Sequence, residues 1–400
     1  MTDANRRPLK LAVVAGEESG DLLGADLVDA LRDMTDRPVE LVGVGGEHLV
    51  ARGLDSLFDP HEIALIGLGA ILKKLPRLIM RIRETAKTIV AARPDCVLLI
   101  DSPDFTHRVA ARIRKSDPSI PIVKYIAPSV WAWRPERAPA MRTYIDHVLT
   151  VLPFETAVME RLKGPESTYV GHRLTRYPPL VQTRAKQLAR EAEREVGGRK
   201  TLLVLPGSRR SEVQSLMAPF GDAIAELSAR VSELEVILPT LPRIEAMVRD
   251  LSKNWPVKPV IVVGEEAKWQ AFAKADAALA ASGTVSLELA LSRIPTVLCY
   301  MPDWFARKFL VPRITIWSAA LPNIIADQPV VPEYFNEFVR PGKLARYLER
   351  LMQPGSARQA QLDGFDRIET IMETDQPSGI IGASVVLRLA EHARPVMGRT

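Results

Sequence analysis

The sequence has few cysteines, little excess charge and no long hydrophobic run. Its 400 residues include only Cys96 and Cys299, which excludes a framework of disulfide bonds. The formal net charge is only +5 and the basic residues form no arm, so no nucleic-acid partner is expected. No apolar run approaches the roughly 20 residues that cross a bilayer, and no secretory pattern follows the N-terminus. These absences predict a cytoplasmic protein that meets a membrane only peripherally.

Motifs for metal chemistry and for covalent hydrolysis are also missing. Neither D-x-D nor H-E-x-x-H occurs, and the six histidines show no metal-ligand spacing. G-x-S-x-G is absent, and neither cysteine has a histidine nearby. We therefore expect no metal and no cofactor. Any phosphate charge should be met by arginine side chains and helix N-termini.

The chain does contain two series of alternating strand and helix patterns. In the first series, short runs rich in Val, Ile and Leu predict strands at 9–15, 40–44, 96–100, 122–126 and 147–151. Helical spacing of apolar residues lies between them, at 22–31, 72–92, 105–114 and 154–162. The second series has strands at 201–205, 235–238, 260–263, 277–281 and 296–300, with an amphipathic helix over 213–231.

Continuous apolar strands joined by helices predict parallel sheets covered on both faces. The fold class is therefore α/β, with two doubly wound Rossmann-like domains at 1–175 and 201–375. A polar stretch at 176–200 that begins with Tyr177-Pro178-Pro179 predicts the linker. A last helix is expected within 376–400, and two partners remain open for it: the N-terminal domain, or a second copy of the chain in a homodimer.

Acidic turns follow two strands of the first series. Gly16-Glu17-Glu18-Ser19-Gly20-Asp21 suits close approach of a hydroxyl-rich or anionic ligand, although Ser19 or Asp21 could simply cap the helix. Asp101-Ser102-Pro103-Asp104 follows the third strand. We expect Asp104 to be a general base in a partly desolvated position, with helix capping as the alternative. Trp131 and Trp133 follow the next strand, and they either pack between domains or line a ligand pocket.

Two turns of the second series suit a nucleoside diphosphate. Gly207-Ser208-Arg209 follows the first strand and offers N–H groups, a hydroxyl and a guanidinium to a diphosphate. Ser282-Gly283-Thr284 opens a later helix, and Glu288 lies one turn farther along, where a carboxylate can hold a ribose diol. For either turn alone, structural capping is the alternative.

Apolar and basic residues alternate over 65–83 and again over 304–310. This pattern is typical of a helix lying at an anionic membrane surface, although a core stripe with solvated cations would look similar. The predicted membrane contacts are Leu72, Lys73, Lys74, Leu75, Arg77, Ile79, Arg81, Trp304 and Phe305.

Seven motifs occur in one order along the chain: GEESGD at 16–21, DSPDF at 101–105, PSVWAWR at 128–134, VGH at 170–172, LPGSR at 205–209, ASGTVSLE at 281–288 and LPN at 321–323. Together they resemble the lipid-A-disaccharide synthase family. The resemblance implies a GT-B glycosyltransferase and an inverting, metal-independent reaction at the inner membrane surface. In it, 2,3-diacylglucosamine passes from UDP-2,3-diacylglucosamine to the 6-hydroxyl of 2,3-diacylglucosamine 1-phosphate (lipid X), giving the β-1',6-linked disaccharide and UDP.

The resemblance also implies roles for single residues. Asp104 and Arg209 would be catalytic. UDP would contact Gly207, Ser208, Arg209, Ser282, Gly283, Thr284, Glu288 and Asn323, and the acceptor side would hold Glu17, Ser19, Gly20, Asp21 and Asp101. The chain departs from the family pattern at Ala70, Thr106 and Asn336, where an acid, an Asn and a Gln are usual. A UDP-sugar 2-epimerase on the same scaffold and a non-catalytic nucleotide-sugar-binding protein are the competing functions.

Overall fold

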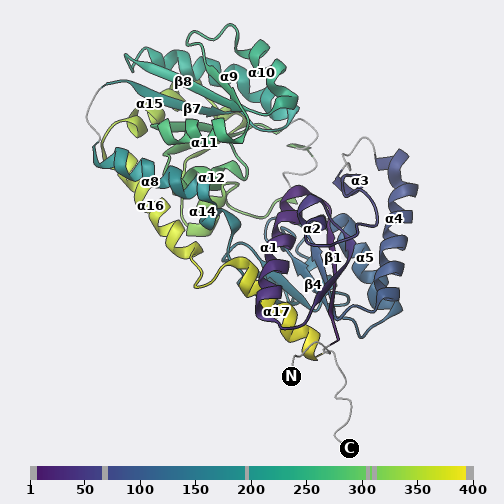
Figure 1. Cartoon of the computed structure of the whole chain (residues 1–400). Helices are drawn as coiled ribbons and strands as arrows, with labels where there is room; N and C mark the ends of the chain where they lie inside the picture. The colour runs from purple at the N-terminus through teal and green to yellow at the C-terminus, as the bar shows by residue number, and fades with distance from the viewer. Residues whose placement is uncertain (1–6, 65–70, 194–197, 303–306, 309–312, 393–400) are drawn as a thin grey trace, which may run out of the picture. The chain divides into compact units, whose positions relative to one another are not determined.

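The structure, a computed structural model, describes the chain except residues 1–6, 65–70, 194–197, 303–306, 309–312 and 393–400 (Figure 1). The backbone of 71–74 is described without its side chains. The described residues divide into two compact units. The first unit comprises Met1–Arg173 and Thr374–Thr400, and the second comprises Leu174–Glu373. Each unit is an α/β domain with its own parallel sheet.

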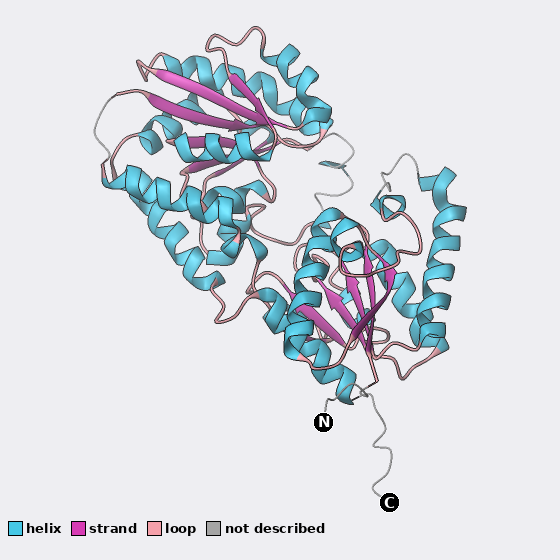
Figure 2. Ribbon diagram, in the orientation of Figure 1, coloured by secondary structure: helices cyan, strands magenta, loops and turns pink. Residues whose placement is uncertain are grey.

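The first unit contains six strands and eight named α-helices among its described residues (Figure 2). Its strands are β1 (Leu9–Ala15), β2 (Val39–Val44), β3 (Cys96–Ile100), β4 (Ile122–Tyr125), β5 (His147–Thr150) and β6 (Glu166–Tyr169). Its helices are α1 (Glu18–Met34), α2 (Glu47–Val50), α3 (His61–Ala64), α4 (Ile71–Ala92), α5 (Pro103–Ser116), α6 (Arg137–Met141), α7 (Glu155–Arg161) and α17 (Ser378–His392). The strands pair in the order β2-β1-β3-β4-β5-β6.

The second unit repeats this plan. Its strands are β7 (Lys200–Leu205), β8 (Leu234–Thr240), β9 (Val260–Val263), β10 (Ala277–Ala281), β11 (Thr296–Tyr300) and β12 (Glu333–Phe335). Its helices are α8 (Pro178–Ala192), α9 (Arg210–Ser228), α10 (Glu245–Ser252), α11 (Glu265–Lys274), α12 (Val285–Leu291), α14 (Leu321–Ala326), α15 (Pro341–Met352) and α16 (Ser356–Met372). The strands pair in the order β12-β11-β10-β7-β8-β9.

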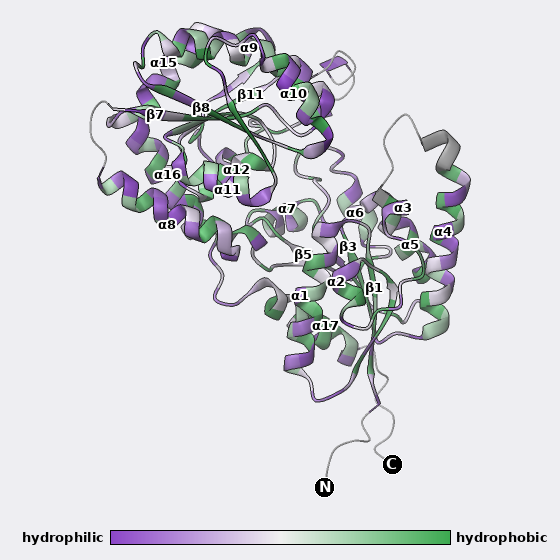
Figure 3. Ribbon diagram, turned by 45° about the horizontal axis from the view of Figure 1, so that its top comes forward, coloured by the Kyte–Doolittle hydropathy of each residue, from purple (hydrophilic) through white to green (hydrophobic). Residues whose placement is uncertain are grey.

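Hydrophobic burial explains why these segments form two layered sheets. The central strands are buried on both faces, as the continuous burial of β3 and β7 shows. Two clusters of buried side chains cover the two faces of the first sheet, and the cluster in the second unit joins α9 and α15 to the strands. Figure 3 shows largely hydrophobic strands and helices of mixed hydropathy. Such helices cover a sheet with one apolar face each.

Both sheets reverse their strand order at one place, which we call the switch point. In the first unit the strands on either side are β1 and β3, paired through Ala15 and Ile100. In the second unit they are β7 and β10, paired through Leu205 and Ala280. Ligands of open α/β sheets bind beyond the carboxyl ends of the strands at such switch points. The four motif turns identified in the sequence follow these four strands.

The stretch predicted as a linker carries the helix α8 instead. Leu180, Thr183 and Gln187 of α8 are buried, and the Gln187 side chain donates to the carbonyls of Phe272 and Ala275 at 2.7 and 3.0 Å. Pro178 and Pro179 do not prevent the helix, because they occupy its first turn, where no intrahelical N–H partner is needed.

The last helix, α17, belongs to the first unit although it follows the second in sequence. It lies beside α1 in Figure 1 and packs closely against it. A Cβ added at Gly379 would come within 2.7 Å of the Asp26 carbonyl of α1, so the two helices approach at backbone distance. The chain therefore passes between the two units twice, after Arg173 and after Glu373.

Candidate active site

The turns after β1 and β3 are in contact at the first switch point. A Cβ added at Gly16 would sit 2.8 Å from the Ser102 hydroxyl, so any larger residue there would force neighbouring side chains to shift. Partial burial, and then the negative charge of Asp101, raise the pKa of Glu17. The structure therefore brings Glu17 and Asp101 together as an acidic pair at the carboxyl ends of β1 and β3.

Asp104 lies in the first turn of α5, directly beyond this acidic pair. The N-cap position belongs to Ser102, so Asp104 is not the helix cap. Its side chain is 70% exposed, and Arg137 Nη2 lies 3.9 Å from Oδ1. The partly desolvated position expected from the sequence is wrong, because this side chain projects into solvent. The arginine is its nearest charged partner among the recorded ion pairs.

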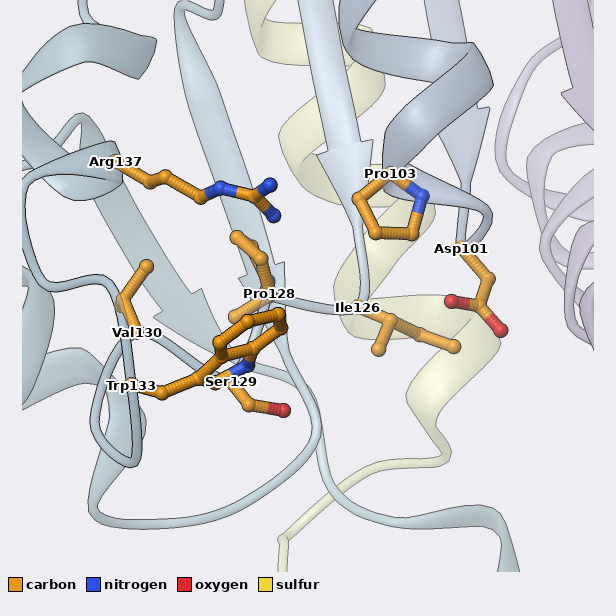
Figure 4. A pocket seen from close by; sticks show the side chains of 9 residues that line it. Asp101, Pro103, Ile126, Pro128, Ser129, Val130, Trp133 and Arg137 are labelled. Carbon is orange, nitrogen blue, oxygen red and sulfur yellow. The ribbon is translucent and has the colours of Figure 1, made fainter. Parts of the chain in front are cut away.

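A pocket of about 270 Å³ opens beside the turn that carries Asp101 (Figure 4). Asp101 and Pro103 form one side, whereas Trp133 and Arg137 lie opposite in the close-up. The remaining lining residues are Ile126, Ala127, Pro128, Ser129 and Val130. The tryptophan-containing loop thus forms a wall of a pocket next to the candidate base.

The two tryptophans of this loop have different roles. Trp131 packs edge-on against Phe154 within the first unit, and its Nε1 donates to Glu155 Oε1 at 3.1 Å. Glu155 Oε2 also accepts from the backbone N–H of Val151 and Leu152. Burial raises the pKa of Glu155 to about 7, although these hydrogen bonds oppose the rise. Trp131 is therefore an internal anchor, and Trp133 is the pocket residue.

A second pocket, of about 650 Å³, lies between the turn after β1 and the segment that follows β2. Its lining includes Glu17 and Asp21, whereas Ser19 and Gly20 are not part of it. The carboxylate of Asp21 accepts from the N–H groups of Gly46 and His48 at 2.6 and 2.8 Å. Asp21 therefore holds the wall of this pocket, and it does not cap α1.

The first turn of the second unit is shaped by Glu212. Its Oε2 accepts from the N–H groups of Ser208 and Arg209, both at 3.2 Å, and its Oε1 accepts from Arg209 Nη1 at 2.9 Å. Gly207 has φ +113, and a Cβ there would lie 2.6 Å from Glu212 Oε2. Those two N–H groups are thus already engaged. This turn can still offer an anion the Ser208 hydroxyl and the Arg209 guanidinium nitrogens that Glu212 does not engage, on a side chain that is 78% exposed.

The second turn of this unit follows β10. Ser282 Oγ donates to the carbonyl of Ala319 at 3.0 Å, and nothing lies within 4 Å of a Cβ built on Gly283. Thr284 is the N-cap residue of α12 and makes no side-chain capping bond. Glu288 is paired, because Lys268 Nζ donates to its two carboxylate oxygens at 3.0 and 2.9 Å. An open glycine turn and an oriented carboxylate therefore lie on the same element.

Asn323 differs from its predicted role. It is only 1% exposed, and its amide bonds with the N–H and carbonyl of Val331 and with Glu333 Oε2. Glu333 in turn accepts from the Ala319 N–H at 2.9 Å and from the Ser318 hydroxyl. This network holds the segment to which Ser282 is bonded. Asn323 therefore supports the turn from inside, and in this arrangement its amide has no exposed face for UDP.

Sequence reasoning missed five supporting side chains: Lys124, Glu212, Arg243, Lys268 and Glu333. Arg243 Nη2 donates to the Ser208 carbonyl at 3.2 Å and adds a second guanidinium near Arg209. Glu212 had a readable signal, since it stands three residues after the N-cap, the spacing of a capping box. The other four come from parts of the chain distant from the turns they support, and no local sequence pattern predicts their contacts.

The membrane-contact residues fall partly outside the described chain. This holds for Trp304 and Phe305 and for the side chains of Leu72, Lys73 and Lys74. Leu75 and Ile79 are exposed on α4. Arg77 and Arg81 both bond with Glu62, and Arg81 also covers the Phe58 ring, so its side chain is only 18% exposed. Arg81 is therefore an internal tie, contrary to its predicted membrane contact.

Two of the family-pattern departures can be located, whereas Ala70 lies outside the described residues. Thr106 is fully buried, and its hydroxyl donates to the carbonyls of Asp101 and Ser102 at 2.8 and 3.1 Å. Asn336 has φ +47 and follows β12 directly. The threonine thus keeps a donor inside the turn that carries Asp101.

No helix in the described part of the chain is both long and apolar enough to cross a membrane. No group of three or more His, Cys, Asp or Glu side chains among those same residues is arranged to hold a metal ion.

Comparisons with solved structures support the fold. The chain has a TM-score of 0.57 to the UDP-GlcNAc 2-epimerase of Neisseria meningitidis bound to UDP-GlcNAc, at 12% identity, covering 96% of this chain and 100% of that one. It has a TM-score of 0.56 to MurG of Acinetobacter baumannii, at 14% identity and with the same coverage. These likenesses show a GT-B-type fold with two Rossmann-like domains and, at such identities, no more.

Sequence relatives are much closer. The family described as Lipid-A-disaccharide synthetase matches residues 11–378. The Lipid-A-disaccharide synthase of Rhodopseudomonas palustris (strain BisB18) is 46% identical over 394 residues, which cover 97% of both chains. With motif turns at both switch points and a match along nearly its whole length, this chain belongs to the lipid-A-disaccharide synthase family.

Proposed function

We propose that this chain transfers 2,3-diacylglucosamine from UDP-2,3-diacylglucosamine to the 6-hydroxyl of 2,3-diacylglucosamine 1-phosphate. The products are the β-1',6-linked lipid A disaccharide 1-phosphate and UDP. Family membership supports the reaction, since the chain matches a family of synthases along residues 11–378. The observation that supports its placement is the position of the motif turns, which occupy the switch points of both sheets.

The two units would divide the substrates between them. The first unit, with Glu17, Ser19, Gly20, Asp21 and Asp101, takes the acceptor, because acidic side chains suit sugar hydroxyls. The second unit takes the UDP-sugar. Arg209 meets the diphosphate, the turn at Ser282, Gly283 and Thr284 lies against it, and Glu288 holds the ribose diol. Gly207 and Ser208 shape the diphosphate side of this site.

Inverting transfer needs a base on the acceptor and charge stabilisation on the leaving group. Asp104 accepts the proton of the 6-hydroxyl while its oxygen forms a bond to the anomeric carbon. The bond from that carbon to the UDP oxygen breaks on the opposite face, and the electron pair leaves with the diphosphate. Arg209 stabilises the charge that develops there, because a guanidinium binds phosphate oxygens through paired N–H donors. Asp104 and Arg209 thus serve the bond formed and the bond broken at one anomeric carbon.

A lipid acceptor also requires access to a membrane. We infer that α4 contacts the inner membrane surface through exposed apolar residues such as Leu75 and Ile79. The sequence of this helix also contains Lys73 and Lys74, whose side chains lie outside the described residues, and basic helices of this kind are attracted to anionic lipid headgroups. Helices of this composition lie in the interface without crossing it.

The test is an incubation with both substrates, followed by the mass of the lipid product and by the amount of UDP. The proposal expects equal amounts of disaccharide and UDP, with UDP appearing only when the acceptor is present. A 2-epimerised UDP-sugar without disaccharide would assign the chain to the epimerase reaction instead. Binding of UDP without any product would make it a nucleotide-sugar-binding protein.

A further inference from the structure

A lysine is buried in the middle of the first sheet, in a strand that is otherwise apolar or aromatic. Lys124 is the third residue of β4 and is 0% exposed. Its strand partners are Leu99 of β3 and Val148 of β5. Because side chains alternate along a strand, Lys124 shares the face of Ile122, which belongs to the core cluster under α4 and α5. A cation in such a place is costly unless a specific partner needs it.

The partner of Lys124 is the backbone of the motif turn. Its Nζ donates to the carbonyl oxygen of Asp101. The Thr106 hydroxyl donates to the same oxygen at 2.8 Å, and the Asp101 N–H donates back to the Tyr125 carbonyl at 3.1 Å. The turn is therefore tied to both β4 and α5.

This turn needs support because its backbone is strained. Asp101 and Ser102 have φ values of +48 and +41, a left-handed region that residues with a side chain rarely adopt. Two such residues in succession persist only where surrounding contacts hold them. The strained pair begins α5 and so sets the position of Asp104, two residues later, and of Asp101 in the pocket wall.

We propose that Lys124 is a positioning residue for glycosyl transfer, which holds the Asp101–Ser102 turn from beneath so that Asp101 and Asp104 face the acceptor. This inference rests on the proposed role of Asp104 as the base. It assigns to Lys124 no contact with either substrate. Its effect passes through one carbonyl oxygen.

The burial of Lys124 costs folding free energy, which is consistent with a lysine kept for its function. Burial lowers the pKa of Lys124 to about 7, while the Asp101 carboxylate opposes that fall. His107 on α5 is neutral, since burial and then the charges of Lys124 and Arg137 lower its pKa to about 3. Because the unfolded chain binds the lysine proton more tightly, burial of Lys124 costs folding free energy that grows as the pH falls below the ordinary lysine pKa and is complete below about 7. An apolar side chain of similar length would remove that cost.

The test compares Lys124→Met, Lys124→Arg and Asp104→Ala with the unmodified chain, using both substrates. For Lys124→Met we expect kcat to fall on the order of 10²-fold, as small misplacements of reacting groups do. The KM for the UDP-sugar should stay unchanged, since the donor turns belong to the other unit, and the melting temperature should stay level or rise. Lys124→Arg keeps a charged donor and should recover most of kcat.

The double variant Lys124→Met/Asp104→Ala separates a positioning role from a general structural one. If Lys124 acts through Asp104, the double variant is no slower than Asp104→Ala alone, because the rate losses of two residues that act together do not multiply. Lys200→Met, at a buried lysine that begins β7, is the matched control and should leave kcat unchanged.

Several outcomes would overturn the inference. Unchanged kcat in Lys124→Met would do so, and so would losses that multiply in the double variant. If Lys124→Met does not fold, the lysine is a structural residue and the inference fails. A folded but inactive Lys124→Arg also contradicts it. Full activity of the single variant Asp104→Ala would instead refute the proposed role of Asp104 as the base. That outcome is distinct from a failure of the Lys124 inference.

Discussion

The two switch points are built from the same fold but are charged and supported in opposite ways. The first is acidic, with Glu17, Asp101 and Asp104, and its turn is held from inside by the buried Lys124. At the second, the turn after β7 presents the cation Arg209, held at the surface by Glu212, whereas the turn after β10 is supported from inside by Asn323 and Glu333. In both units the supporting charge is opposite to that of the motif side chains nearest to it.

This difference fits the chemistry of two unlike substrates. A sugar hydroxyl that must lose a proton is served by carboxylates, whereas a departing diphosphate is served by guanidinium groups. A buried support fixes a backbone turn rigidly. A support at the surface leaves a long arginine side chain free to move from its carboxylate to a phosphate. We infer that the turn carrying Asp101 is preorganised and that the Arg209 side chain adjusts when UDP binds.

Asp104→Ala should give the largest effect and should separate the two switch points most clearly. Removing a general base typically costs 10²–10⁴-fold in rate, so kcat should fall by about that factor. UDP affinity should not change, because this residue belongs to the acceptor turn. Turnover assays and calorimetric titration with UDP measure both quantities. Asp222→Ala, at an exposed carboxylate on α9, is the control, and normal turnover in Asp104→Ala would remove its assigned role.

Arg209→Ala should affect both rate and donor binding. We expect kcat to fall about 10²–10³-fold, as when one preorganised donor to a developing anion is lost. UDP should bind more weakly while uridine binds as before, since only the diphosphate meets the guanidinium. Arg210→Ala, at the exposed neighbour that begins α9, is the matched control. Equal loss in both variants would mean that general positive charge, rather than this side chain, is needed.

Lys268→Met should have a smaller effect on the nucleoside side of the donor site. Lys268 holds both oxygens of Glu288, so its loss frees the carboxylate to rotate away from the ribose diol. We expect affinity for UDP and for uridine to fall by about tenfold each, near the 1.4 kcal/mol of one charge-assisted bond. Titration with both ligands checks this. A loss confined to UDP would place Lys268 near the diphosphate instead.

Glu155→Gln should change the pH dependence of stability with little effect on UDP binding. Burial raises the pKa of Glu155 to about 7 from 4.5, so the folded chain holds this proton more tightly than the unfolded chain. Stability from this group is therefore present at low pH and is lost as pH rises through about 4.5 to 7. Between pH 5 and 8 the unmodified chain should lose up to about 3 kcal/mol more unfolding free energy than the variant. The measurement is urea unfolding of both chains at several pH values. The same pH dependence of the unfolding free energy in both would contradict the raised pKa of Glu155.

Much of the fold could be predicted from the sequence because buried parallel strands are continuous apolar runs. Ten of the strands follow that pattern closely. Two of the four edge strands in the described sheets did not, since β6 reads Glu-Ser-Thr-Tyr and β12 has only three residues. The sequence predicted a linker where helix α8 lies, because most residues of α8 are polar and only a few, such as Leu180, are buried.

The motif turns could also be located from the sequence, but their supports could not. Glycines, prolines and acids at strand ends are local signals, and the fold places them at the switch points. The contacts of Lys124 and Lys268 join residues about 20 positions apart or more, through sheet pairing and helix packing. Asn323 illustrates the limit most clearly, because its motif suggested a ligand contact while its amide is engaged inside the protein.

The proposed mechanism requires Asp104 and Arg209 to act on opposite sides of one anomeric carbon. Since Cys96 and Cys299 are both buried, cysteines placed at the exposed Arg108 and Arg210 can be spin-labelled selectively. Distances between the labels would be measured in an active double variant, with and without UDP-sugar and acceptor. We predict that both substrates together produce one narrow, short-distance population. A distribution that stays long and unchanged in their presence would contradict the account.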